Sequence, residues 1–161
     1  MSRFLSRFSG VYENSPWVAE RLLALHGELD DITRIEAAMV KIVDAASFEE
    51  KIALIRSHPD LAVSQDDAGQ LTSESREEQH SAGLDSCSSG EVERFDLLNR
   101  KYREKFGIPF VIAVWGKSRY EILDAFETRL GNDFDTEFGN AIAEIHKIAA
   151  LRLNRLDVKK A

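Results

Sequence analysis

Residues 92–116 read VERFDLLNRKYREKFGIPFVIAVWG. In the first part of this stretch, apolar residues recur every three or four positions, as they do along one face of a helix. They are Val92, Phe95, Leu98, Tyr102 and Phe106. Gly107 follows directly, and glycine is the residue that most often adopts the left-handed conformation of a helix cap. The stretch therefore predicts a long amphipathic helix that ends near Phe106.

The segment that follows, residues 108–115, breaks the helical pattern. It is apolar throughout and is bracketed by Gly107 and Gly116, which favours a buried extended chain or a buried helical turn. An extended segment in a helical protein has no sheet to pair its backbone amides, so these groups need side chains, water or a ligand. A core segment satisfied by neighbouring helices and a segment that binds a ligand both remain open.

Helical periodicity also dominates the N-terminal part of the chain. Asn14 or Ser15 can cap a helix that has Pro16 in its first turn and runs to about Leu25. A second apolar stripe at helical spacing follows, formed by Ile32, Ile35, Met39, Ile42 and Val43.

Two capping boxes predict further helix starts, at Ser47 with Glu50 and at Ser118 with Glu121. Gly131 is expected to end the second of these helices. The last helix carries an apolar stripe of Phe138, Ile142, Ile145 and Ala149. We predict one compact all-α domain over residues 1–161, with a short buried non-helical or extended segment near residues 108–115.

The composition fits a single globular domain. A chain of 161 residues with 43% hydrophobic and 30% charged residues is ordinary for this class, and a domain of this size buries roughly 70% of its unfolded surface. The formal net charge is −7 and no block of lysine or arginine stands out. Nucleic acids and anionic membranes are therefore not expected as partners, because both bind preferentially to a basic surface patch.

Cysteine use and hydropathy indicate the compartment. Cys87 is the one cysteine, so no internal disulfide can form and a reducing compartment suits the chain. No apolar run approaches the roughly 18 residues that cross a bilayer, and the first residues lack the apolar core of a secretory signal. We expect a cytoplasmic protein.

His58 is the first candidate for chemistry. It follows a predicted helix over residues 47–57 and precedes Pro59, which biases His58 toward an extended backbone at the helix end. Histidine is the side chain that changes charge near neutral pH. A proton-transfer role and a structural role, in which the imidazole interacts with the helix dipole, both fit the pattern.

The stretch from Ser75 to Gln79 is the second candidate. Ser75 followed by Glu78 matches a capping box, which predicts a helix that starts near Ser75. A helix start also exposes backbone N–H groups that can bind an anion, and the Gln79 amide can both donate and accept. Capping and catalysis do not exclude each other here.

Arg152 is the third candidate. It lies seven residues after Ile145 and four after Ile148, so it falls within the apolar stripe of the last helix. A buried arginine needs a counter-charge. One explanation is a packed stem with the head at the water interface; the other is a guanidinium that holds a carboxylate or carbonyl oxygen of a ligand.

Other chemistries have no signature in the sequence. No His-x-x-x-His, Cys-x-x-Cys or carboxylate cluster predicts a metal site. No glycine-rich loop predicts a nucleotide site, and no Gly-x-Ser-x-Gly elbow predicts a serine hydrolase.

Taken together, these residues make the chain resemble the 2-oxo-4-hydroxy-4-carboxy-5-ureidoimidazoline (OHCU) decarboxylases of purine breakdown. Five stretches carry the resemblance in order, and they span nearly the whole chain: residues 10–17 (GVYENSPW), 58–62 (HPDLA), 74–84, 102–114 and 144–153.

The resemblance implies an all-α enzyme, usually a homodimer, that uses no metal or organic cofactor. Its substrate is a small ureide, OHCU, which loses CO₂ to give (S)-allantoin during urate degradation. The resemblance implies catalytic roles for His58, Glu78 and Arg152. It also implies substrate-pocket positions at Pro59, Ser75, Gln79, Phe110, Val111, Ile112, Ala113 and Val114.

Two alternatives remain. The chain could be a helical binding or scaffold protein that has kept the fold without the activity, although His58, Glu78 and Arg152 argue against it. It could also be a cofactor-free lyase or hydrolase that acts on a related ureide.

Overall fold

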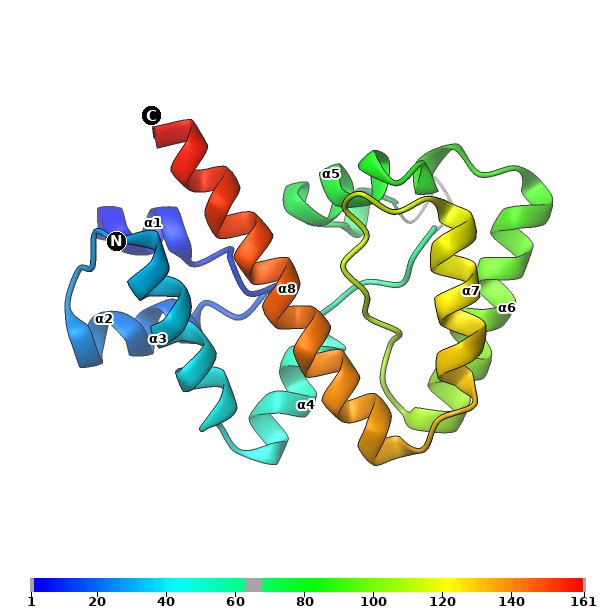
Figure 1. The fold of residues 1–161 in the computed structure, drawn as a ribbon, viewed down its shortest axis with the longest axis horizontal. Coiled ribbons are helices and arrows are strands. Elements are labelled where there is room, and N and C mark those ends of the chain that lie inside the picture. Colours follow the sequence, from blue (N-terminus) through cyan, green and yellow to red (C-terminus); the bar gives the residue numbers. More distant parts are fainter. Residues whose placement is uncertain (1, 63–67, 161) are drawn as a thin grey trace. The chain divides into compact units, whose positions relative to one another are not determined.

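Figure 1 shows the computed structural model of the chain, which describes residues 2–62 and 68–160. Within these residues all regular structure is helical, which confirms the predicted all-α class. The α-helices are α1 (Arg3–Phe8), α2 (Trp17–His26), α3 (Ile32–Asp44), α4 (Phe48–Arg56), α5 (Ser73–Ser81), α6 (Ser89–Phe106), α7 (Arg119–Leu130) and α8 (Phe134–Lys160). Two 3-10 turns, η1 (Ala68–Gln70) and η2 (Leu84–Ser86), flank α5. Residues 63–67, in the stretch between His58 and Ser75, lie outside the described residues.

The chain divides into two compact units. The first comprises Met1–Ser57 with Ile145–Ala161, and the second comprises His58–Glu144. Helix α8 therefore contributes to both, with its first part in the second unit. A single domain over residues 1–161 remains a prediction. In the part of the chain that the structure describes, no helix is long and apolar enough to cross a bilayer.

The first unit contains α1 to α4 and the C-terminal part of α8, and α2 and α3 lie side by side in it (Figure 1). The predicted stripe of α3 is buried at Ile35, Met39, Ile42 and Val43, which confirms that this face forms core. The capping box of α4 is formed: Glu50 N–H donates to Ser47 Oγ at 3.1 Å, and Ser47 N–H donates to Glu50 Oε1 at 3.3 Å.

The predicted cap of α2 is wrong. The N-cap residue is Pro16, which makes no side-chain capping bond. Ser15 Oγ instead donates to the Glu13 carbonyl at 2.8 Å, and Asn14 has a positive φ of 45°. The Ser15 hydroxyl is thus used within a tight turn ahead of the helix, whereas Asn14 Nδ2 donates to the Ser57 carbonyl at 3.4 Å. Asparagine tolerates a positive φ better than most residues, which suits Asn14 to this turn.

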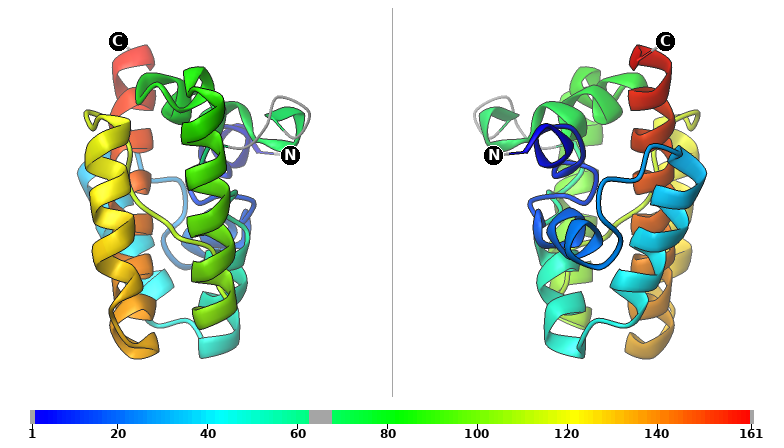
Figure 2. Two further views of the ribbon diagram at one scale, coloured as in Figure 1. Left: turned by 90° about the vertical axis from the view of Figure 1, so that its right-hand side faces the viewer. Right: turned by 90° about the vertical axis from the view of Figure 1, so that its left-hand side faces the viewer.

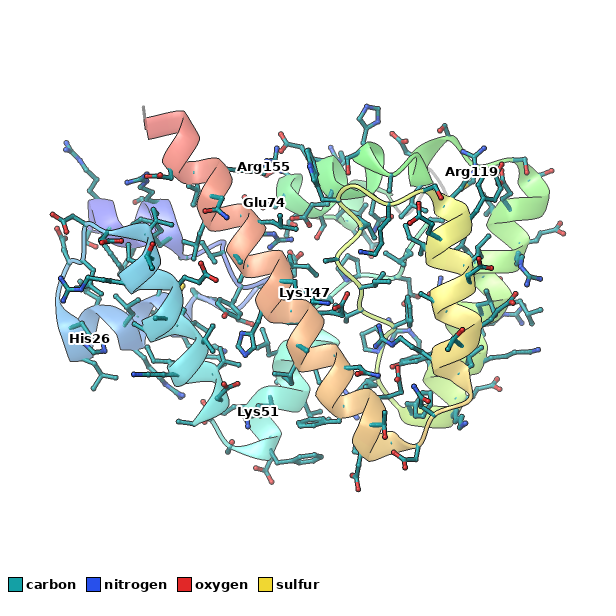
Figure 3. All side chains as sticks on the ribbon, in the orientation of Figure 1. His26, Lys51, Glu74, Arg119, Lys147 and Arg155 are labelled. Atoms are coloured by element: carbon teal, nitrogen blue, oxygen red, sulfur yellow. The ribbon has the colours of Figure 1, made fainter. Side chains whose placement is uncertain are left out.

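In the second unit, α6 and α7 run parallel and side by side (Figures 1 and 2). At their starts, Arg119 Nε lies 2.7 Å from Glu91 Oε2, and Figure 3 shows Arg119 at the first turn of α7. At their ends, Lys105 Nζ donates to the Leu130 carbonyl at 2.7 Å. Because the two helices are parallel, the chain must return from the end of α6 to the start of α7. An extended residue advances about 3.3 Å and a helical residue only about 1.5 Å, so an extended segment covers this return with few residues.

That connection is the apolar segment predicted from the sequence. Gly107 ends α6 in the left-handed conformation, with φ 70°, as predicted. Residues 108–114 are buried and contain no helix or strand, which confirms the predicted buried non-helical segment, except that Trp115 at its end is exposed. Gly131 does end α7, but its φ of −80° is ordinary rather than left-handed. The predicted capping box between Ser118 and Glu121 is formed.

The N-cap of helix α5 lies three residues earlier than the predicted cap, Ser75. Its N-cap is Thr72, whose Oγ1 accepts the Ser75 N–H at 3.1 Å, and its first residue is Ser73. The capping box predicted for Ser75 and Glu78 is therefore not formed. Ser75 already lies within the first helical turn, so its hydroxyl does not serve as the cap.

Candidate active site

The loop that begins at His58 is tied to α5 by one side chain. Gln79 Oε1 accepts the Ala62 N–H at 3.0 Å, and Gln79 Nε2 donates to the Asp60 carbonyl at 3.1 Å. Ala62 has a positive φ of 53°, a conformation that costs a non-glycine residue roughly 1–2 kcal/mol. The two amide bonds from Gln79 hold the loop in this turn.

Helix α6 holds the same loop from a second element. The Arg103 guanidinium donates to Asp60 Oδ1 from Nε at 3.0 Å and from Nη2 at 2.8 Å. The buried Asn99 donates from Nδ2 to the Leu61 carbonyl at 3.1 Å. Because consecutive residues of the loop are each bonded to a helix, the backbone that follows His58 is fixed before any ligand binds.

His58 lies where the sequence places it, immediately after Ser57, the C-cap of α4. Its side chain is only 6% exposed, so the imidazole is largely removed from water. Pro59 is half-buried beside it. An imidazole at the start of a fixed, buried loop suits proton transfer, because its direction does not depend on a mobile chain.

Helix α5 presents the second group of predicted residues on one face. Ser75, Glu78 and Gln79 are three and four positions apart, which places them together on the helix surface. Ser75 and Gln79 are buried, and Glu78 is half-buried. Because Gln79 binds the His58 loop, this face of α5 and the loop belong to one assembly within the second unit.

Two backbone groups of residues 110–114, the Val111 carbonyl and the Ala113 N–H, find partners on two helices. The Val111 carbonyl accepts from Arg129 Nη1 at 2.7 Å. The Ala113 N–H donates to Glu144 Oε1 at 3.1 Å. Phe110 stacks on Phe126, with ring centroids 3.9 Å apart. The segment is therefore bonded by side chains of α7 and α8 as well as packed.

Behind this segment lies a carboxylate that is entirely buried. Glu137 Oε1 accepts from Arg129 Nε at 2.8 Å and from Tyr102 Oη at 2.6 Å. Its Oε2 accepts from Asn132 Nδ2 at 2.9 Å and from Asn140 Nδ2 at 2.8 Å. Burial raises the pKa of Glu137, but the hydrogen bonds from the two asparagines and Tyr102, with the Arg129 charge, lower it more, so its pKa lies below the ordinary value.

Arg152 is buried, with 4% of its surface exposed. Its guanidinium therefore does not lie at the water interface, which was one of the two explanations for its place in the apolar stripe. Its counter-charge is Glu13, whose Oε2 lies 3.0 Å from Arg152 Nη2. Arg152 Nη1 also donates to the Gly10 carbonyl at 3.2 Å. The predicted need for a counter-charge is therefore met by a residue of the protein itself, within the first unit.

Sequence reasoning identified neither Glu13 as a partner of Arg152 nor a hydrogen-bonded chain of Tyr12, His146 and Asp44 in the same unit. Tyr12 Oη lies 2.8 Å from His146 Nδ1, and His146 Nε2 lies 2.9 Å from Asp44 Oδ1. Burial, followed by the charges of Asp44 and Glu36, raises the pKa of Tyr12, which keeps the phenol protonated. With the phenol O–H donating to His146 Nδ1, the other ring nitrogen of His146 can donate to Asp44 Oδ1. The conspicuous signal was the stretch 10–17, which supplies both Tyr12 and Glu13.

The predicted site residues thus fall into two groups. His58, Pro59, Ser75, Glu78, Gln79 and residues 110–114 belong to the second unit, whereas Arg152 belongs to the first. That they reach one substrate stays a prediction. No cluster of three or more histidine, cysteine, aspartate or glutamate side chains able to hold a metal ion occurs within residues 2–62 and 68–160.

The chain is similar to known proteins over almost its full length. Residues 1–154 match the family model described as OHCU decarboxylase. A relative from Halalkalicoccus jeotgali, named 2-oxo-4-hydroxy-4-carboxy-5-ureidoimidazoline decarboxylase, is 40% identical over 158 residues, which cover 98% of this chain and 87% of the relative.

Two solved structures share the fold. One, described as (S)-allantoin synthase, has a TM-score of 0.74 and 32% identity and covers 94% of this chain and 49% of its own. Another, an OHCU decarboxylase in the presence of (S)-allantoin, has a TM-score of 0.73 and 22% identity and covers 91% of this chain and 94% of its own. With its full-length family match and its 40% identical relative, the chain belongs to the OHCU decarboxylase family.

Proposed function

We propose that this protein decarboxylates OHCU to (S)-allantoin in urate degradation, without a metal or organic cofactor. The observation that carries the proposal is the His58 loop. It presents a buried imidazole, and Gln79 joins it to the helix face that bears Ser75 and Glu78. The family to which the chain belongs supplies the substrate.

The substrate itself can accept the electron pair that decarboxylation releases. Its C4 carries both the carboxylate and a hydroxyl, and the ring double bond joins the neighbouring C5 to nitrogen. When the C4–carboxylate bond breaks, its electron pair forms a C4–C5 double bond, and the ring nitrogen takes up a proton. The hydroxyl proton is then lost and a proton arrives at C5, which leaves a carbonyl at C4. No external electron sink is needed, which fits an enzyme without a cofactor.

We assign the proton transfers to His58. An imidazole can both donate and accept a proton, so His58 can bond the C4 hydroxyl or carboxylate and then assist protonation at C5. Glu78, on the helix that holds the loop, orients or polarises that imidazole and bonds a substrate hydroxyl or N–H. Delivery of the proton to one face of C5 makes the product a single enantiomer.

The remaining residues bind and orient the substrate. Arg152 and backbone N–H groups of residues 110–114 stabilise the oxygen charge that develops as CO₂ leaves. Ser75 and Gln79 hold the ureido group, with Gln79 using the N–H that does not bond the Asp60 carbonyl. Pro59 lines the pocket. We also propose that the protein is a homodimer, as the family resemblance implies, which sedimentation would test. The cytoplasmic location is proposed from the cysteine use and hydropathy of the sequence.

Freshly generated OHCU provides the test, because it decays slowly and without selectivity on its own. The protein should accelerate loss of OHCU and produce (S)-allantoin, detected by circular dichroism of the product. If the protein gives no acceleration over the spontaneous rate, it is a helical binding or scaffold protein instead. A panel of related ureides then separates OHCU decarboxylation from other ureide chemistry, since a preferred alternative substrate would contradict the assignment.

A further inference from the structure

We propose that Arg129, held by the buried Glu137, is a positioning residue that points the Ile112 N–H at the substrate. This inference rests on the proposed function, which assigns backbone N–H groups of residues 110–114 to the substrate. It selects one of those groups and identifies the side chains outside the pocket that orient it.

The direction of the Ile112 N–H follows from its peptide group. The carbonyl of Val111 and the N–H of Ile112 belong to one peptide plane, and in a trans peptide they point in opposite directions. No cis peptide occurs in the described residues. Since the Val111 carbonyl points to Arg129 Nη1 at 2.7 Å, the Ile112 N–H points away from α7.

In the next peptide group, which joins Ile112 to Ala113, it is the N–H and not the carbonyl that bonds a helix. The Ala113 N–H points to Glu144 Oε1 at 3.1 Å, so it is already committed to α8 and the Ile112 carbonyl points away from that residue. Among the described residues, no hydrogen bond takes up the Ile112 N–H. A donor with a fixed direction and no acceptor among residues 2–62 and 68–160 is suited to a developing oxyanion.

Arg129 is in turn held on three sides. Its Nε bonds Glu137 Oε1 at 2.8 Å, its Nη1 bonds the Val111 carbonyl, and its guanidinium lies 4.4 Å from the centroid of the Phe110 ring. Glu137 is 0% exposed, and its two oxygens accept four hydrogen bonds. A carboxylate with all four acceptor directions occupied has no capacity left for a substrate. Its effect on catalysis is therefore exerted through Arg129.

A role in stability alone does not explain this arrangement. Removing two charges from water costs free energy that offsets their attraction. A buried ion pair therefore stabilises a fold, in general, no more than apolar residues of the same volume. What the pair provides here is a guanidinium with a unique orientation at the Val111 carbonyl, next to the peptide plane that carries the proposed donor. Placement errors of about 1 Å can reduce rates about 100-fold, so such a device matters for turnover.

The test compares Arg129→Lys and Glu137→Gln with wild type. Lysine can bond the Val111 carbonyl or Glu137 but cannot reproduce the guanidinium fork, and glutamine removes the charge while keeping the shape of the side chain. We expect kcat/KM for OHCU to fall about 10- to 100-fold in both variants. Titration calorimetry with (S)-allantoin should show a raised Kd at full stoichiometry, whereas partial unfolding would lower the stoichiometry and leave the Kd unchanged.

Arg94→Gln is the matched control, because Arg94 also links α6 to α7, through Glu127, but at the exposed surface. It should leave both the Kd and kcat/KM unchanged. Folded Arg129→Lys and Glu137→Gln proteins with wild-type Kd and kcat/KM would overturn the inference while the proposed function stands. If the wild-type protein has no activity toward OHCU, the proposed function is wrong, and so is this inference, which rests on it.

A measurement on wild type does not depend on the variants folding. Addition of (S)-allantoin should shift the Ile112 amide resonance more than that of Ala113, whose N–H is already bonded to Glu144. A larger shift at Ala113 than at Ile112 would show that the assigned direction is wrong.

Discussion

The guanidinium of Arg152 and the carboxylate of Glu13 form a buried ion pair, with Nη2 and Oε2 3.0 Å apart. The two residues are 139 positions apart in the sequence and are 4% and 1% exposed. Arg152 is thus charge-neutralised by the protein before a substrate is present. A substrate carboxylate that binds Arg152 must share the guanidinium with Glu13, which holds its direction.

Glu13→Gln should therefore destabilise the fold. Removal of the Glu13 charge breaks a buried ion pair, which costs about 3 kcal/mol of unfolding free energy. Urea unfolding followed by circular dichroism measures this. Glu50→Gln is the control, since Glu50 pairs with Arg21 at the exposed surface and should change stability by less than about 1 kcal/mol. Equal effects of the two substitutions would contradict the buried pair.

Gln79→Met should release the loop that follows His58. The change removes both amide bonds and leaves the Ala62 N–H and the Asp60 carbonyl without partners, at a cost of about 2 kcal/mol or more. Activity should fall with stability, because the backbone next to the imidazole is no longer fixed. Gln70→Met, at an exposed position, is the control. If the Gln79 variant were as stable as wild type, the two hydrogen bonds of Gln79 would not be needed to hold the loop.

Thr72→Ala should weaken α5 at its start. Thr72 Oγ1 accepts the Ser75 N–H, and loss of an N-cap of this kind costs about 1 kcal/mol. Thr72→Ser keeps the hydroxyl and should unfold like wild type. Thermal unfolding of the two variants distinguishes this cap from the capping box at Ser75 and Glu78. If Thr72→Ala had no effect, Thr72 would not be the cap.

Stability should depend on pH through Glu137. The pKa of this carboxyl is lowered in the folded state, so the unfolded chain binds more protons as the pH falls below the ordinary value of 4.5. The contribution is present above that value and is lost toward the lowered, folded-state pKa. Glu137→Gln should unfold about 3 kcal/mol more easily at neutral pH. The difference from wild type should shrink as urea unfolding is repeated down to about pH 3. A constant difference would contradict the lowered pKa.

Local sequence patterns predicted the helices well where the signal and its partner are close together. The capping boxes at Ser47 and Ser118 and the left-handed Gly107 depend only on neighbouring residues, and all three are formed. Helix α5 shows the limit. Both Thr72 and Ser75 can cap a helix, and the residue types alone do not decide between overlapping starts. The capping-box motif predicts Ser75, whereas the structure uses Thr72.

The candidate site was predictable as residue types but not as partners. Burial of Arg152 followed from helical periodicity, yet Glu13 as its partner did not, because the pairing spans most of the chain. The apolar segment was recognised by composition, whereas the bond from Arg129 to Val111 depends on how α7 packs. The parallel arrangement of α6 and α7, which makes that segment extended, has no local signature.

The most direct test of the account is turnover of OHCU by His58→Asn. Asparagine keeps a hydrogen-bonding side chain at the start of the loop but cannot transfer a proton near neutral pH. The variant should retain wild-type helical circular dichroism, and its kcat should fall by about 10²- to 10⁴-fold, the usual contribution of general acid–base catalysis. A folded His58→Asn protein that forms (S)-allantoin at the wild-type rate would contradict the proposal that His58 carries the reaction.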